Sequence, residues 1–217
     1  METIGADAAK LAGLQIDFLQ KFRNGQITTS HLEWFLGLTK EERTLLSGTS
    51  TFDPRFQLVN TFYLVVPYGY DHATRLASFR REHGRELSYC NPNITDEKFS
   101  RVTIRLVPGR RLKVKVFQIT QQVSSEDCLA FLRTQNAVFV GAQGASLAYE
   151  LARDQLPVSR GSISFDKRKA LWKDIDGYRW EPSVVRGSDG RFSFYIDLFN
   201  SVLSEENCLL CFCDPSA

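Results

Sequence analysis

The chain has 217 residues, with 27 basic and 25 acidic side chains and a formal net charge of +2. This near balance excludes a bulk attraction to nucleic acid or anionic membranes, so any basic surface must be local. Hydrophobic residues make up 43% of the chain and sixteen are Phe, which excludes an intrinsically disordered protein.

The sequence carries no signal for export or membrane insertion. No apolar run approaches the roughly 18 residues that a membrane-spanning helix needs. The first residues also lack the basic and apolar regions of a signal peptide. The cysteines are odd in number: Cys90, Cys128, Cys208, Cys211 and Cys213. We therefore expect a cytoplasmic protein with reduced thiols that binds no membrane, while its oligomeric state stays open.

Residues 1–48 are predicted to form a short helical leader. Four apolar side chains are spaced for one helical face: Leu11, Leu14, Phe18 and Phe22. Ser30 with Glu33 has the spacing of a capping box, which predicts a second helix. A polar linker at 47–51 then separates the leader from a domain at 52–217. The leader could dock on its own chain or on a partner.

Strand and helix patterns alternate in the next hundred residues. Strands are predicted at 62–66, 101–107, 111–119 and 137–140, and helices at 71–83, 124–133 and 145–153. Ser124 has the position and side chain of an N-cap, with Asp127 three residues later. This part of the chain is therefore a central mixed segment.

After Pro157 the pattern changes to short apolar or aromatic runs. These lie at 162–165, 170–172, 178–180, 192–196 and 208–213. Asp176-Gly177 and Asp189-Gly190 are typical of hairpin turns. The C-terminal part is predicted to be β-rich, with a possible sub-boundary near 157. The fold class that follows is α+β.

The central segment is predicted to contain an amphipathic β-hairpin from Arg101 to Ile119. Apolar and polar residues alternate in both of its strands, which places one face in the core and one in solvent. Because opposite residues must share a face, the loop should have three or five residues, with Gly109 at positive φ.

The outer face of this hairpin is the predicted binding surface. Its residues are Arg101, Arg105, Arg110, Arg111, Lys113 and Lys115, and no acidic residue occurs in 101–115. Opposed like charges are unfavourable, so something should offset them. An acidic protein or the phosphates of a nucleic acid would do so. Acidic residues elsewhere in the fold would do so equally, leaving an ordinary solvated face.

Three further motifs have an ordinary structural interpretation. Cys208-Leu-Leu-Cys211-Phe-Cys213 could suggest zinc or iron–sulfur, but as a strand it directs Cys208 away from the other two thiols. Gly141–Gly144 lacks the lysine and hydroxyl residue of a phosphate-binding loop, and is predicted to be a tight turn. Cys128 has no histidine placed near it by any pattern. We therefore predict no metal and no cofactor.

Four stretches carry a resemblance to a known family. They are FLQKFRNGQITTSHLEWFLGLTKEER (18–43), RLVPGRRLKVKVFQIT (105–120), SSEDCLAFLRTQNAVFVGAQGASLAYE (124–150) and CLLCFCD (208–214). Together they resemble an uncharacterised protein family of Candidate Phyla Radiation (Patescibacteria) bacteria. The resemblance implies a bacterial, intracellular protein, and it assigns no catalytic residue.

The leading functional prediction is a non-enzymatic binding or interaction protein, because no convergent catalytic set is visible. The first alternative is a nucleic-acid-binding protein that uses the basic hairpin. The second is an enzyme, such as a hydrolase, whose site has no recognisable motif.

Overall fold

The computed structural model describes residues 15–25, 28–29, 33 and 53–215. The chain divides into two compact units, residues 1–51 and 52–217. In the first unit, residues 15–23 form a helix that ends at Asn24 and Gly25, where φ is +72°. Helix is therefore confirmed for this part of the leader. Leu11, Leu14 and the linker at 47–51 lie outside the described residues.

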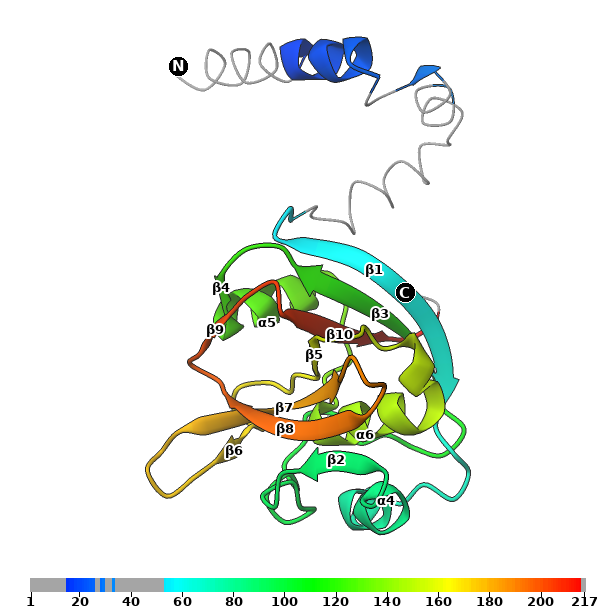
Figure 1. The fold of residues 1–217 in the computed structure, drawn as a ribbon, viewed down its shortest axis with the longest axis vertical. Coiled ribbons are helices and arrows are strands. Elements are labelled where there is room, and N and C mark those ends of the chain that lie inside the picture. The colour runs from blue at the N-terminus through cyan, green and yellow to red at the C-terminus, as the bar shows by residue number, and fades with distance from the viewer. Residues whose placement is uncertain (1–14, 26–27, 30–32, 34–52, 216–217) are drawn as a thin grey trace, which may run out of the picture. The chain divides into compact units, whose positions relative to one another are not determined.

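The second unit contains three α-helices and one short 3-10 helix (Figure 1). They are α4 (Arg75–His83), α5 (Ser125–Thr134), α6 (Gly141–Ala152) and η1 (Arg153–Gln155). Ser124 caps α5 in a capping box with Asp127, as predicted. In the described residues, no helix is long and apolar enough to cross a membrane.

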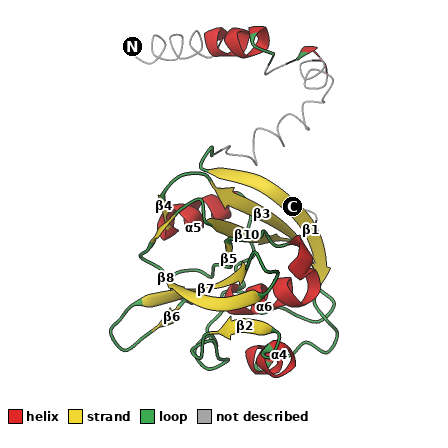
Figure 2. Ribbon diagram, viewed as in Figure 1, coloured by secondary structure: helices red, strands yellow, loops and turns green. Residues whose placement is uncertain are grey.

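Ten strands accompany these helices, and the predicted α+β class is confirmed (Figure 2). They are β1 (Phe56–Val65), β2 (Leu87–Cys90), β3 (Arg111–Ile119), β4 (Val123–Ser124), β5 (Gly161–Ile163), β6 (Trp172–Lys173), β7 (Arg179–Arg186), β8 (Phe192–Leu198), β9 (Val202–Leu203) and β10 (Asn207–Cys213). The main sheet has the order β1-β3-β10-β5-β7-β8-β2, with β6 added to β7. Strands β4 and β9 form a separate pair.

Strand β10 is buried on both faces, because helices cover the sheet from two sides (Figure 1). Cys208, Leu210 and Phe212 pack in the core that contains α6. Leu209, Cys211 and Cys213 pack in the core that contains α5. The prediction that Cys208 points away from the other two thiols is therefore confirmed.

Helix α6 lies deep in the protein, and Gly144 permits its close approach to β10. Residues 141–149 are all buried. A Cβ atom on Gly144 would lie 2.3 Å from Val140 Cγ2 and 3.1 Å from the Phe212 ring. The helix begins at Gly141, so Gly141–Gly144 is its first turn and the predicted turn before a helix at 145 is wrong.

The predicted hairpin is wrong, because residues 101–107 do not form a strand. Strand β3 pairs with β1 along one edge and with β10 along the other. No edge is left for a third partner. Residues 137–140 are also not a strand, although Val138 N donates a hydrogen bond to Phe212 O at the edge of β10.

The C-terminal prediction agrees better with the structure. Residues 161–213 contain the strands β5 to β10. The turn at Asp176-Gly177 joins β6 to β7, and the turn at Asp189-Gly190 joins β7 to β8. Both glycines have positive φ, +90° and +79°, as hairpin turns of this kind require.

Candidate nucleic-acid interface

The six predicted basic residues do not share one face. Arg101 and Arg105 lie on the loop before β3, and Arg110 pairs with Asp214 at 2.9 Å. The face of β3 that points away from α6 holds the remaining three: Arg111, Lys113 and Lys115. The prediction of a continuous basic face on two neighbouring strands is therefore wrong.

Lys113 and Lys115 lie on a strand that is paired along both edges, so neighbouring strands flank them. Both are half-buried, and β10 places Cys213 beside Lys113 and Cys211 beside Lys115. The two sulfur atoms are 3.5 Å apart. The hydrogen bond with the Cys211 thiol and the charges of Lys115 and Lys113 lower the pKa of Cys213 below its usual range. The positive charges of these lysines therefore stabilise the thiolate form of a buried cysteine, in addition to contributing to the surface charge.

A different set of cations surrounds an open cavity of about 560 Å³. We call it the basic cleft. It is lined by Arg101, Thr103, Arg133, Lys167, Arg168, Lys169 and Ala170. The five charged side chains are all exposed, and no carboxylate of the described residues lines the cleft. They come from the 101–107 loop, the last turn of α5 and the 167–170 turn between β5 and β6.

Asp166 connects two walls of the basic cleft. This side chain is 3% exposed and accepts hydrogen bonds from Thr103 N at 3.1 Å and Lys167 N at 2.7 Å. It also accepts a short hydrogen bond from the Thr103 hydroxyl. Burial raises the pKa of Asp166 to about 6, against the opposing effect of these hydrogen bonds. Thr103 uses its backbone N–H and its hydroxyl here instead of in a sheet.

Most of the cleft cations form no ion pair with the described residues. Arg168 pairs with Glu126 at 2.9 Å, and both side chains are about half exposed. Within residues 53–215, no ion pair is formed by Arg101, Arg133, Lys167 or Lys169. A concave surface lined by unpaired charges of one sign concentrates the electrostatic field and attracts anions.

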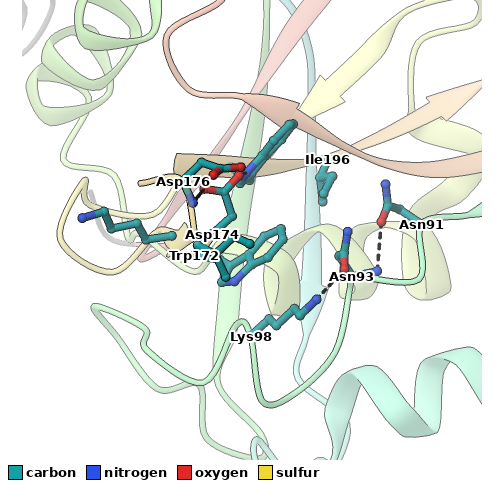
Figure 3. A pocket seen from close by; sticks show the side chains of 10 residues that line it. Asn91, Asn93, Lys98, Trp172, Asp174, Asp176 and Ile196 are labelled. Atoms are coloured by element: carbon teal, nitrogen blue, oxygen red, sulfur yellow. Dashed lines mark hydrogen bonds between the residues drawn. The ribbon is translucent and has the colours of Figure 1, made fainter. Parts of the chain in front are cut away.

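A second cavity, of about 600 Å³, contains a pair of tryptophans (Figure 3). We call it the tryptophan cleft. It is lined by Asn91, Asn93, Lys98, Trp172, Lys173, Asp174, Ile175, Asp176, Trp180 and Ile196. Trp172 and Trp180 are register partners on β6 and β7, with ring centroids 6.2 Å apart and an interplanar angle of 28°.

Polar side chains fix the walls of the tryptophan cleft. Trp180 Nε1 donates a hydrogen bond to Asp174 Oδ2 at 2.9 Å. Lys98 Nζ lies 4.6 Å from the centroid of the Trp172 ring and donates a hydrogen bond to Asn93 Oδ1 (Figure 3). A cation over an indole face is a favourable interaction, so Lys98 covers this face of Trp172 in the structure.

The two clefts are neighbours, because the same two chain segments form their walls. Lys98 lines the tryptophan cleft and Arg101 the basic cleft, three residues apart. In the second segment, Ala170 lines the basic cleft and Trp172 lines the tryptophan cleft. Three extended residues span at most about 10 Å. The cationic cleft and the aromatic cleft therefore lie close to each other.

The nearest approach to a catalytic pair is a buried carboxyl pair on β7 and β8. Glu181 is fully buried and faces Asp197 across the strands. Burial and the charge of Asp197 raise the pKa of Glu181 well above its usual range. Ser183 Oγ donates to Asp197 Oδ2 at 2.5 Å. Neither carboxyl group lines either cleft, so this pair does not contact a substrate bound in the basic cleft or the tryptophan cleft.

The described residues contain no group of three or more His, Cys, Asp or Glu side chains that could hold a metal ion. Comparison with known proteins finds no matching family model, no matching curated protein and no matching solved structure. The candidate interface therefore depends on the geometry of this chain alone.

Of the predicted basic residues, only Arg101 lines the basic cleft. Sequence reasoning missed Arg133 and the run Lys167-Arg168-Lys169. The run was a visible signal, because three consecutive cations outside a strand or helix mark a local basic surface. Nothing in the sequence indicated that Arg133 would join it, since that depends on how α5 packs.

Proposed function

We propose that this protein is a non-enzymatic binding protein whose ligand is single-stranded nucleic acid. The observation that carries the proposal is the basic cleft, where five exposed cations surround one cavity and no carboxylate of residues 53–215 is among its lining residues. A phosphate backbone supplies the regularly spaced negative charges that such a cleft attracts, and release of counterions favours binding.

The neighbouring tryptophan cleft favours a single strand over a duplex or an acidic protein. Proteins that bind single strands combine a cationic groove for the backbone with aromatic side chains for the bases. A duplex keeps its bases stacked and offers no ring to Trp172. An acidic protein gains little from the tryptophan cleft, because stacking on indole rings needs flat aromatic groups, which every nucleotide supplies as its base. The proposal includes the bacterial cytoplasm that the family resemblance implies.

The test compares two double charge reversals in the full-length protein. The first, Lys167→Glu with Lys169→Glu, reverses two cations of the basic cleft. The second, Lys113→Glu with Lys115→Glu, reverses two cations of the β3 face that the sequence predicted as the binding surface. Circular dichroism and thermal unfolding first establish that both variants fold. Binding to fluorescent single-stranded DNA and RNA is then measured over a range of salt concentrations.

Five phosphate contacts on a single strand would lower wild-type affinity about 100-fold between about 50 and 200 mM salt. The cleft variant should lose affinity roughly 25-fold at about 0.1 M salt, and its slope should be shallower by about 1.4. The β3 variant should bind as the wild type does.

Three results would overturn the proposal. The first is that the wild type does not bind either strand. The second is that the β3 variant loses binding and the cleft variant keeps it. The third is that polyaspartate of equal charge binds as tightly as the strand, which would indicate a surface for acidic proteins.

A further inference from the structure

We infer that the tryptophan cleft is a base-binding subsite, which takes one unpaired nucleobase of a strand whose phosphates lie in the basic cleft. This inference rests on the proposed function and adds to it, because it separates phosphate attraction from base recognition. The cleft combines an aromatic surface, amide groups and a position close to the basic cleft.

The aromatic surface is the first part of the argument. Trp172 and Trp180 are directly opposite on β6 and β7, so their side chains project from the same face of the sheet. Their rings are stacked at an interplanar angle of 28° rather than edge to face, and both indoles contribute an aromatic surface to the cleft. Every nucleobase has a flat π-face that can stack on such a surface.

The amide groups are the second part. Asn91 and Asn93 line the wall beside the aromatic surface (Figure 3). The Asn91 side chain uses Oδ1 to accept from Asn93 N at 2.9 Å, which leaves its NH₂ group as a donor. Unstacked bases are recognised by hydrogen bonds to their edges, and amides supply both donors and acceptors for this purpose.

Lys98 lines the tryptophan cleft at a position close in the chain to the basic cleft. In the structure its ammonium group covers the Trp172 face and bonds Asn93. A base that stacks on Trp172 would take this place, and the long flexible side chain could then turn towards a phosphate. Because Lys98 precedes Arg101 by only three residues, that phosphate would lie next to the cations of the basic cleft.

The inference predicts a preference for strands with bases over strands without them. The probes are oligothymidylate of about ten nucleotides and an abasic strand of equal length, which carries the same phosphates. One stacked base should make the wild-type affinity for oligothymidylate roughly 5- to 150-fold higher than that for the abasic strand.

Tryptophan fluorescence detects the stacking of a base without a substitution in the tryptophan cleft. The chain has three tryptophans, Trp34, Trp172 and Trp180. In a Trp34→Phe background, both remaining indoles line the tryptophan cleft. Their fluorescence should be quenched by oligothymidylate and remain unchanged with the abasic strand.

Two variants identify the surface responsible. Trp172→Leu keeps apolar bulk but removes the indole, so the affinities for the two strands should become nearly equal. Tyr195→Leu is the matched control: it removes an exposed aromatic ring that stacks on Tyr89 at 5.0 Å, outside both clefts. The control should keep the full preference for oligothymidylate.

The possible failures are distinguishable. If both strands bind equally well and neither quenches the fluorescence, the base subsite is refuted while phosphate binding in the basic cleft stands. If neither strand binds, the proposed function itself fails. If a neutral oligosaccharide quenches the two tryptophans and oligothymidylate does not, the cleft binds a sugar and the inference is overturned.

Discussion

Replacing Asp166 by Asn should change how the stability of this protein depends on pH. The carboxyl group is 3% exposed, and burial raises its pKa from 3.8 to about 6. Asn has nearly the same shape and keeps one oxygen to accept from Lys167 N and Thr103. It cannot ionise in this range, so Asp166→Asn removes the titration and preserves much of the packing.

The sign follows from proton binding in the two states. Between pH 3.8 and about 6 the unfolded chain has released the Asp166 proton while the folded protein still holds it. Stability therefore falls as pH rises through this window and stays lower above it. A shift of about two pKa units corresponds to about 3 kcal/mol. About 2 kcal/mol of that loss develops between about pH 4 and pH 8.

Urea unfolding at several pH values measures the contribution of Asp166 to the unfolding free energy. The contribution is the difference between the wild type and Asp166→Asn. Glu181 and Asp197 also have raised pKa values, and their effects are common to the wild type and the variant. From about pH 4 to pH 8, the wild type should lose about 2 kcal/mol more unfolding free energy than Asp166→Asn does. Asp189→Asn, an exposed change in the β7–β8 turn, should behave as the wild type. A difference below about 0.5 kcal/mol, or one of opposite sign, would refute the reasoning.

Two further predictions concern packing and capping. Gly144→Ala should destabilise the protein by about 1–3 kcal/mol in urea unfolding, because the new methyl group would overlap Val140 and press on Phe212. Its control, Gly69→Ala, has no atom within 4 Å of the new Cβ and should change stability by less than about 0.5 kcal/mol. Ser124→Ala should cost about 1 kcal/mol, measured as a lower midpoint of thermal unfolding, because Asp127 N loses its acceptor at 3.1 Å. If either Gly144→Ala or Ser124→Ala is as stable as the wild type, the energetic role argued for the corresponding contact is wrong.

Local signals predicted the elements whose cause is local. The Ser124–Asp127 spacing predicted the start of α5, and the two Asp-Gly pairs predicted the β6–β7 and β7–β8 turns. Alternation in residues 111–119 predicted the buried and exposed faces of most of β3. Each of these patterns depends on residues within one element or on two that are adjacent in the chain.

The failures have a long-range cause. Residues 101–107 alternate as a strand does, but β1 and β10 already pair with both edges of β3. Thr103 instead bonds Asp166, 63 residues later. The same contact brings Arg101 close to the 167–170 turn and so creates the basic cleft. An interaction at this separation leaves no periodic signal in a single sequence, which is why the hairpin was predicted and the cleft was not.

The electrostatics of the basic cleft favour a binding role over a purely structural one. Four of its five cations have no ion pair within residues 53–215, although the chain as a whole is nearly neutral. The carboxyl group that orders the cleft walls is Asp166, whose burial opposes its ionisation. The fold thus places unpaired cations and a costly buried acid in the same region. Local departures from the most stable arrangement are expected where a surface is shaped for a ligand. A strand of phosphates would relieve the repulsion among these cations.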